Sequence, residues 1–233
     1  MSKQELLNFL DITRLSGEIE IKEIALDIKK DSISALAVSS NRVVALKGTL
    51  KGKFDDLGVI GIGDTQGFID VVSLFKSEID ITLNKNKLTL KEGTLKANTT
   101  LKSSQYVNNG IPEDKFNQLY TKVTTEGKPF VLEIENLKKI VDYLATIKST
   151  EIEFSGKKDA ISINAKNVND DITDDLPIKF DGEFSIKLGK AILEVLSVMN
   201  EKVTITAKEP NPVLINLKKD SMEINLLVAP LKA

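Results

Sequence analysis

The stretch Gly58–Leu83 contains the spacing closest to a nucleotide-binding loop. Its four glycines precede an amphipathic run: Gly58, Gly61, Gly63 and Gly67. The dinucleotide pattern needs a third glycine where Gln66 stands, and a P-loop needs Lys followed by Ser or Thr where Asp64 and Thr65 stand. An aspartate at a helix start would also repel phosphate, whereas it can cap the helix by accepting a free N–H. Nucleotide binding is therefore the weaker interpretation, and a tight strand-to-helix turn is favoured.

The acidic segment Asn167–Pro177 is the second candidate for chemistry, as a calcium loop. It reads NVNDDITDDLP and lacks both the glycine at position six and the glutamate at position twelve of such a loop. A solvated hairpin loop is the favoured interpretation. We therefore predict no metal site and no cofactor.

The absence of two residue types narrows the possible functions. The chain has no histidine and no cysteine, so the commonest general base and the ordinary zinc ligands are missing. Catalysis would rest on scattered Asp, Glu, Lys, Tyr or Ser residues without a recognisable spacing. We expect a protein that is not an enzyme, and a carboxylate-dependent enzyme is the less favoured alternative.

Composition also bears on location and on charge. The lack of cysteine suits a reducing compartment, and no apolar run reaches membrane-spanning length. The N-terminal apolar run is broken by Asn8 and Asp11, so no secretory signal is predicted and we expect a cytoplasmic protein. With 32 basic and 34 acidic residues, nucleic-acid binding would need charge sorted onto one face.

A helix, a short polar turn and an alternating strand recur four times along the chain. The third copy shows the helical period best, with apolar residues at 137, 140, 141, 144 and 147. Further alternating runs with hairpin signals lie between the copies. The predicted class is α+β: four β-α-β-β-β units, two per domain, with antiparallel sheets and all helices on one face. The four copies are Glu5–Ile21, Gly67–Leu83, Asn136–Phe154 and Gly189–Ala207.

One segment separates the first two units from the last two. Tyr106–Phe130 shows neither period and contains Asn-Asn-Gly, a proline and Glu-Gly-Lys-Pro. A connector of this length is usually functional or mobile. The predicted domains are an N-terminal domain at 1–107, an interdomain connector at 108–128 and a C-terminal domain at 129–233.

This order of elements resembles the DNA sliding clamp family, and most closely its T-even-phage type, which is related to the proliferating cell nuclear antigen clamps. The local marks are DTQGFIDVVSLFKSEIDITL, VLEIENLKKIVDYLATIKSTEIEF and the tail INLLVAPLK. The resemblance covers nearly the whole chain and implies the DNA clamp fold, with helices lining a ring and sheets outside. It also implies a homotrimer around duplex DNA that reads no sequence, tethers the replicative DNA polymerase and is loaded by a clamp loader ATPase. A phage-encoded clamp would work in the cytoplasm of a bacterial host.

The resemblance implies which cations face DNA. A sliding protein needs phosphate contacts without base readout, so cations on the polar helix faces or beside the helix ends are the candidates. Asp70, Asp142 and Glu194 share these faces, so the second and fourth helices are expected to be nearly neutral and DNA contact weak. The candidates are Lys3, Arg14, Lys76, Lys138, Lys139, Lys148, Lys190 and Lys202.

Two further surfaces follow from the same resemblance. A partner pocket is expected between the connector and the C-terminal tail, lined by Val38, Arg42, Ile111, Ala229, Pro230 and Leu231. Subunits are expected to pair near Lys96–Leu101 in one chain and Asn169–Lys179 in the next. The interface candidates are Lys96, Leu101, Asp170, Asp171, Ile178 and Lys179. A clamp-fold interaction protein without a DNA-sliding role is the other interpretation left open.

Overall fold

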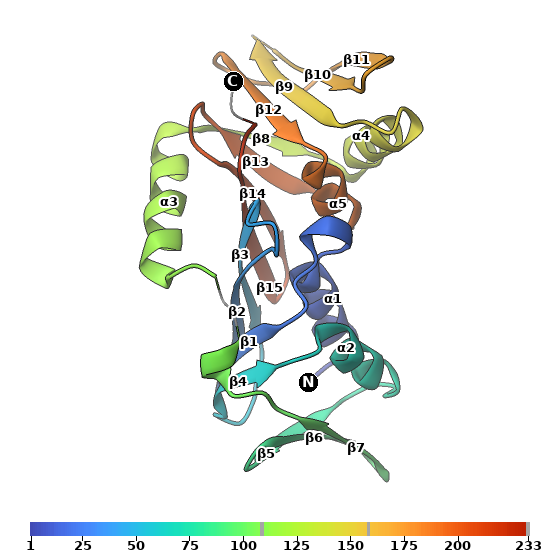
Figure 1. The fold of residues 1–233 in the computed structure, drawn as a ribbon, viewed down its shortest axis with the longest axis vertical. Coiled ribbons are helices and arrows are strands. Elements are labelled where there is room, and N and C mark those ends of the chain that lie inside the picture. Colours follow the sequence, from blue (N-terminus) through green and yellow to red (C-terminus); the bar gives the residue numbers. More distant parts are fainter. Residues whose placement is uncertain (108–109, 158, 232–233) are drawn as a thin grey trace.

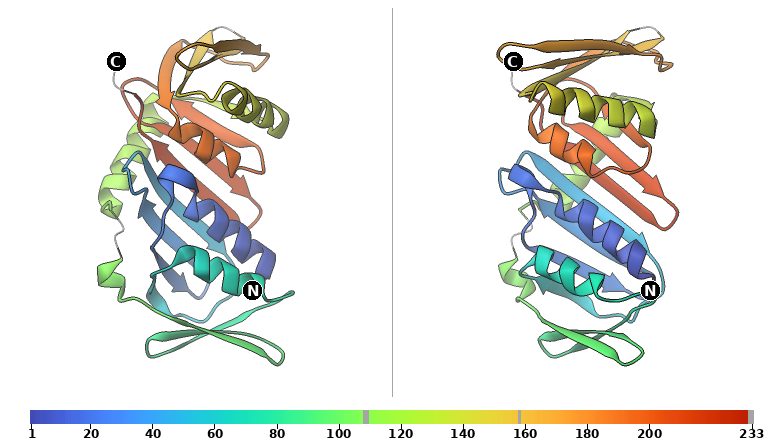
Figure 2. Two further views of the ribbon diagram at one scale, coloured as in Figure 1. Left: turned by 45° about the vertical axis from the view of Figure 1, so that its right-hand side comes forward. Right: turned by 90° about the vertical axis from the view of Figure 1, so that its right-hand side faces the viewer.

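The computed structural model of the chain describes residues 1–107, 110–157 and 159–231. An eight-stranded antiparallel sheet forms the middle of the molecule, with a three-stranded sheet at one end and a four-stranded sheet at the other (Figure 1). In the described part of the chain, four helices stack along one face and a fifth lies alone on the opposite face (Figure 2). The predicted α+β class with antiparallel sheets is confirmed.

The first half of the chain contains two helices, two short 3₁₀ turns and seven strands. They are α1 (Lys3–Arg14), η1 (Gly17–Ile19), β1 (Ile24–Lys29), β2 (Ser32–Val38), β3 (Val44–Lys51), β4 (Gly58–Ile62), α2 (Thr65–Ser73), β5 (Asp80–Asn84), β6 (Lys87–Glu92), β7 (Leu95–Thr100) and η2 (Ser104–Tyr106).

The second half repeats this order after an additional helix. Its elements are α3 (Glu113–Glu126), β8 (Lys128–Leu132), α4 (Ile134–Thr146), β9 (Glu151–Lys157), β10 (Ala160–Lys166), β11 (Asp171–Leu176), β12 (Phe184–Gly189), α5 (Ala191–Ser197), β13 (Val203–Ala207), β14 (Val213–Lys219) and β15 (Met222–Val228). None of the helices in the described ranges has the length and apolar composition needed to cross a membrane.

The strand before each helix pairs with the other unit of its own half. Thus β4 pairs with β1, β12 with β9 and β8 with β13. In the first unit this strand is reduced to an isolated bridge between Ser2 and Glu78, just before β5. The predicted β-α-β-β-β units are therefore present with this one reduction, and each pair of units is interlocked through exchanged strands.

Within the sheets, the two halves join through one strand pair, β3 with β15. Its antiparallel register runs from Met222 opposite Leu50 to Val228 opposite Val44. The central sheet therefore has the order β4-β1-β2-β3-β15-β14-β13-β8 and crosses the boundary between the halves. One continuous apolar core lies between this sheet and the four stacked helices.

Two expected strands differ from the structure. The first copy was expected to end in a strand by Ile21, but Gly17–Ile19 form a 3₁₀ turn and β1 begins only at Ile24. Leu15 and Gly17 both have φ near +60°, which turns the chain out of an extended course. The second copy was expected to give a half-buried strand, yet β5 is mostly exposed and Leu83 faces solvent.

The connector differs most from expectation. Residues 108–109 lie outside the described residues, as do residues 232–233 of the predicted C-terminal domain. The segment for which the sequence indicated neither period forms the 14-residue helix α3. Its apolar stripe consists of only four residues, at the helical spacing i, i+3, i+4 and i+7. They are Phe116, Leu119, Tyr120 and Val123.

The turn into α2 gives a direct test of the capping interpretation. The Asp64 carboxylate accepts a hydrogen bond of 2.9 Å from the Gly67 N–H. Asp64→Ala should therefore lower the free energy of unfolding by about 1 kcal/mol, measured by urea denaturation. Asp70→Ala is the matched control, because Asp70 lies exposed on the same helix and its carboxylate accepts from the Gln66 side chain rather than from a backbone N–H of the first turn. Equal losses in the two variants would contradict the cap.

Candidate interaction surfaces

The four stacked helices α1, α2, α4 and α5 carry nearly balanced charge. Along α1 two cations are offset by two acids, and the same holds along α4. The only charged residue within α2 is Asp70, and within α5 it is Glu194. The residues within these four helices therefore do not by themselves form a basic surface.

All eight predicted DNA-facing cations lie on these helices or in the turns beside their ends. Three of them form ion pairs: Arg14 with Glu20 at 2.8 Å, Lys139 with Asp174 at 2.6 Å and Lys190 with Glu18 at 3.0 Å. Within the described ranges the other five form no ion pair. They are Lys3, Lys76, Lys138, Lys148 and Lys202.

The Lys139 ammonium joins α4 to β11 through its ion pair with Asp174. The Tyr143 hydroxyl also donates to the Asp174 carboxylate at 3.2 Å, and the ammonium lies 5.7 Å from the Tyr143 ring centre. The hydrogen bond from Lys139 lowers the pKa of Asp174, and the same bond raises the pKa of Lys139. The Asp174 carboxylate therefore contributes to the stability of the fold above about pH 4, and this contribution is lost on acidification. The contribution of the Lys139 ammonium is lost only as pH rises beyond about 10. At neutral pH the charge of Lys139 is therefore already partly offset by Asp174, which weakens its attraction to a phosphate.

The predicted subunit interface falls on two strand edges at opposite ends of the molecule (Figure 1). β7 pairs only with β6, and β11 pairs only with β10, so each has a second edge that the described single chain does not pair. Such edges are templates for pairing with another chain. Lys96 lies in β7 and Leu101 just after it, Asp170 and Asp171 lie at the start of β11, and Ile178 and Lys179 lie just beyond its end.

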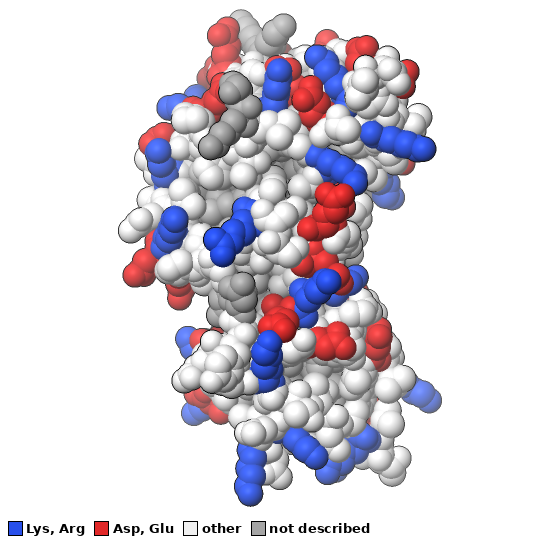
Figure 3. Space-filling model, in the orientation of Figure 1, with Lys and Arg blue, Asp and Glu red and all other residues white. Residues whose placement is uncertain are grey.

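Charge is sorted between these two ends. Figure 3 shows Lys and Arg side chains gathered at the lower end, over the three-stranded sheet. The lysines of that sheet and its turns are Lys85, Lys87, Lys91 and Lys96, whereas β11 and the residue before it carry Asp170, Asp171, Asp174 and Asp175. Lys102, just after β7, binds both carboxylate oxygens of Glu23 at 2.7 Å within the same chain.

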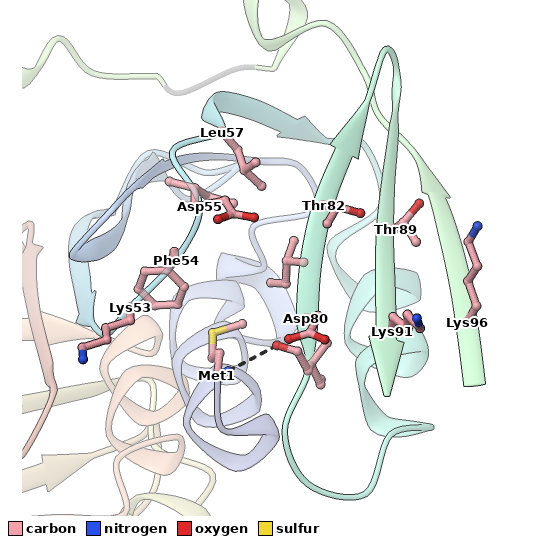
Figure 4. Close-up of a pocket in the computed structure, with 13 residues that line it drawn as sticks. Met1, Lys53, Phe54, Asp55, Leu57, Asp80, Thr82, Thr89, Lys91 and Lys96 are labelled. Atoms are coloured by element: carbon pink, nitrogen blue, oxygen red, sulfur yellow. Dashed lines mark hydrogen bonds between the residues drawn. The ribbon is translucent and has the colours of Figure 1, made fainter. Parts of the chain in front are cut away.

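An open hollow of about 670 Å³ borders the β7 edge. The loop at 52–57 forms one wall, and the outer face of β5, β6 and β7 forms the other (Figure 4). Across the three strands Asp80 lies opposite Lys91, and Lys91 lies opposite Lys96. Two lysines, Lys91 of β6 and Lys96 of the edge strand β7, therefore lie side by side on this face.

The lone helix α3 covers an apolar row on the outer face of the central sheet. The strand registers place Ala45 beside Leu227, and Leu227 beside Leu214. Phe116 and Val123 are fully buried against this row, in a small cluster separate from the main core. The partly buried members of the cluster are Leu36, Ala45, Ile111, Leu119 and Tyr120.

Polar contacts hold α3 at both ends. The Lys47 ammonium lies 2.8 Å from a Glu113 carboxylate oxygen and donates to Asn117 at 3.2 Å. At the other end the Asn211 amide donates to Glu126 at 3.1 Å. Sequence reasoning missed these contacts, because they join α3 to strands and loops distant along the chain.

The six predicted partner-binding residues fall into two neighbouring places. Val38 lies at the end of β2, and Ile111 packs in the cluster below α3. The Ala229 N–H donates to the Val43 carbonyl at 2.9 Å, beside Arg42, whereas the Leu231 N–H donates to the Lys187 carbonyl of β12 at 2.8 Å. The Leu231 side chain is 43% exposed and lies against Gly189, and Pro230 joins the two places.

Comparison with known proteins identifies the fold. No protein-family model and no curated protein sequence matches the chain. The structure of the C-terminal region of FEN-1 bound to A. fulgidus PCNA matches with a TM-score of 0.78 and 17% identity, over 100% of this chain and 97% of that one. The proliferating cellular nuclear antigen from Entamoeba histolytica matches with a TM-score of 0.79 and 12% identity, over 99% and 96%. The chain has the fold of these proteins along its full length.

Proposed function

We propose that this chain is a DNA sliding clamp, a non-enzymatic processivity factor that closes with two further copies into a homotrimeric ring around duplex DNA. The observation that carries this proposal is the arrangement of one helix layer between two unpaired strand edges. The helices α1, α2, α4 and α5 cover a single face, and the edges of β7 and β11 lie at opposite ends of the molecule. The full-length fold match to proliferating cell nuclear antigens supports the same function.

Head-to-tail association follows from these two edges. β7 of one copy and β11 of the next form a heterologous contact, which makes a ring when the rotation closes. The acids near β11 and the lysines near β7 complement each other in such a contact. Two β7 edges would set lysine against lysine, and two β11 edges aspartate against aspartate, so charge opposes the symmetric pairings.

The balanced helix layer suits sliding rather than tight binding. Phosphate contacts supply affinity without sequence readout, and here few cations are available for them. A closed ring stays on DNA through topological linkage, so a weak and rapidly exchanging contact is sufficient.

The proposed protein partners are a DNA polymerase and a clamp loader ATPase. One similar structure, that of A. fulgidus PCNA, holds the C-terminal region of FEN-1. We place partner tails of this kind on the outer face, between α3 and the chain's own C-terminal tail. The residues proposed to receive them are Val38, Arg42, Ile111, Ala229, Pro230 and Leu231. If phage-encoded, the protein would act in the cytoplasm of a bacterial host.

Retention on circular DNA tests the proposal. Light scattering should give about three times the chain mass of 25.6 kDa. The protein, placed on a nicked circular plasmid by its loader, should co-elute with that plasmid and be lost when the plasmid is cut once. Equal retention on cut and uncut plasmid would contradict a sliding ring. A trimer retained on neither would favour the clamp-fold interaction protein, and a monomer at low and high salt alike would exclude the ring.

Cations of the helix layer should set the salt dependence of DNA binding. We expect the variant Lys3→Ala/Lys138→Ala to flatten the slope of log affinity against log salt by about 0.9 for each phosphate that is no longer neutralised, equally for all sequences. Fluorescence anisotropy across a salt series measures this slope. Lys115→Ala/Lys122→Ala, on the exposed face of α3, is the matched control. A slope that changes only in the control would exclude the inner-face assignment.

A further inference from the structure

The junction between the two halves provides a template for the contact between copies. Within the chain, β3 is the last strand of the first unit and β15 the last strand of the fourth, and they pair side by side. The last strands of the second and third units are β7 and β11, each at one edge of its sheet. Pairing β7 with β11 of another copy would therefore repeat the internal junction.

The first equivalence relates the first unit to the third. β2 and β10 have the same length and the same alternating burial, and each follows its hairpin at the same offset, with Lys29 opposite Ser32 and Lys157 opposite Ala160. Ile33 therefore corresponds to Ile161. Because Ile33 pairs with Leu50 and Ile161 pairs with Leu176, Leu50 of β3 corresponds to Leu176 of β11.

A recurring side-chain contact supports this equivalence. Ser34 corresponds to Ser162, and the residues opposite them are Thr49 and Asp175. The hydroxyls of Ser34 and Thr49 lie 3.5 Å apart, and the Ser162 hydroxyl donates to the Asp175 carboxylate. The same cross-strand polar pair thus occurs at the same place in both units.

The second equivalence relates the second unit to the fourth. The last five residues of β6 and of β14 share one burial pattern. Their hairpins also match, since Glu92 lies opposite Leu95 and Lys219 opposite Met222. Leu95 of β7 therefore corresponds to Met222 of β15, and Lys96 to Glu223.

We infer the register of the contact between copies from these correspondences. In the internal junction Met222 lies opposite Leu50, and Glu223 opposite Thr49. The same register between copies sets Leu95 opposite Leu176, and Lys96 opposite Asp175. The inference rests on the proposed head-to-tail ring, and the partner it names is the β11 edge of a second copy of this chain.

This register also matches the chemistry of the two edges. Leu95 is 41% exposed in the single chain. In the inferred contact it lies opposite Leu176, which is also apolar. Asp80, Lys91 and Lys96 lie side by side across β5, β6 and β7. In the inferred contact Asp175 of the next copy continues this row beside Lys96. A slip of one residue would turn each side chain to the other face. A slip of two residues would set Leu95 opposite Asp174, whose carboxylate is held by Lys139.

Introduced cysteines can read the register, because the chain contains no cysteine of its own. Lys96→Cys combined with Asp175→Cys places two thiols directly opposite, where cross-strand Cβ atoms lie about 4.5–5.5 Å apart, close to the distance a disulfide needs. Lys96→Cys combined with Thr173→Cys is the offset control, with diagonal Cβ atoms about 7–8 Å apart. Lys96, Thr173 and Asp175 are all exposed, so both double variants should fold.

The outcomes separate the register from the ring itself. Under mild oxidation the 96/175 variant should form covalent dimers and trimers on a non-reducing gel, and the 96/173 variant should not. Cross-linking of the 96/173 variant alone would overturn this register and leave the ring intact. A parent trimer with neither variant cross-linked would place the interface elsewhere, whereas a monomeric parent would overturn both the ring and the register.

Charge reversal gives a second measurement. Lys96→Asp should weaken association roughly fivefold per interface, because like charges directly opposite destabilise a strand pair. Asp175→Lys should do the same, and the two changes together should restore association. Lys85→Asp, an equal charge change in the β5–β6 turn, is the control. Failure of the double reversal to recover the parental trimer would contradict the Lys96–Asp175 pairing.

Discussion

Replacing Phe116 by alanine is expected to release α3 from the sheet while the rest of the molecule stays folded. Truncating a fully buried phenylalanine costs about 3–5 kcal/mol. Among the described residues the cluster below α3 has four fully buried members, Phe116, Val123, Leu214 and Leu227, so this loss removes a large part of the apolar contact that holds the helix on the sheet. Hydrogen exchange should then rise across residues 113–126.

The matched control for this prediction is Gln118→Ala, an exposed position on the same helix. It should leave the exchange of α3 unchanged. The central sheet should keep its protection in Phe116→Ala, because its ladders run from strand to strand without α3. Unchanged exchange in α3 together with a lower melting temperature of the whole protein would show that α3 is an integral part of the core.

Release of α3 would also bear on the proposed partner surface. Ile111 packs in the same cluster, and the row of Ala45, Leu227 and Leu214 would become exposed. Exposed apolar rows of this kind bind hydrophobic dyes and partner segments. An increase in dye fluorescence in Phe116→Ala, absent in Gln118→Ala, would report the uncovered row.

The helices that face the core were predictable from the sequence because their apolar stripes are wide. Leu137, Ile140 and Leu144 are buried in α4 as predicted, and Ile192, Val195 and Leu196 are buried in α5. The interpretation of Asp64 as a cap is borne out by its bond to Gly67. In each case the signal lies within one turn or one helix, where spacing alone determines which side chains meet.

The features that the sequence did not predict depend on distant residues. α3 has a narrow stripe and begins after Pro112 without a side-chain cap, so its helical period is weak. The pairing of Lys139 with Asp174 joins α4 to β11, and the bond from Leu231 to Lys187 joins the tail to β12. No local pattern encodes such contacts, because they form only when the sheets assemble.

The junction of the two halves on the helix side depends on one glutamate. Glu194 of α5 accepts the backbone N–H groups of Glu18 at 3.3 Å and Ile19 at 3.2 Å. Lys190 adds an ion pair to Glu18. This carboxylate, 176 residues away from Glu18 along the chain, satisfies amides that an extended strand would have paired in a ladder. It explains why η1 stands where the sequence predicted a strand.

Gly17→Ala should weaken this junction strongly. Gly17 has φ of +60°, and a Cβ there would overlap the Glu194 carboxylate. The left-handed backbone costs an alanine about 1 kcal/mol. Displacing the carboxylate also removes the Glu194 acceptor from the N–H groups of Glu18 and Ile19, of which Ile19 keeps the Ser16 carbonyl. We expect a total loss of about 2–4 kcal/mol, seen as a fall in melting temperature of about 5–10 °C.

A second glycine isolates the contribution of Glu194. Gly58 has nearly the same φ, +65°, but a Cβ there would meet no atom within 4 Å. Gly58→Ala should therefore show only the backbone cost, about 1 kcal/mol. The excess loss in Gly17→Ala measures the contact with Glu194, and it should shrink when Glu194→Ala is already present, because the obstructing carboxylate is then gone. Equal losses in the two glycine variants would mean that Glu194 contributes nothing to joining the halves, and the turn at Gly17 would then be held by its own backbone alone.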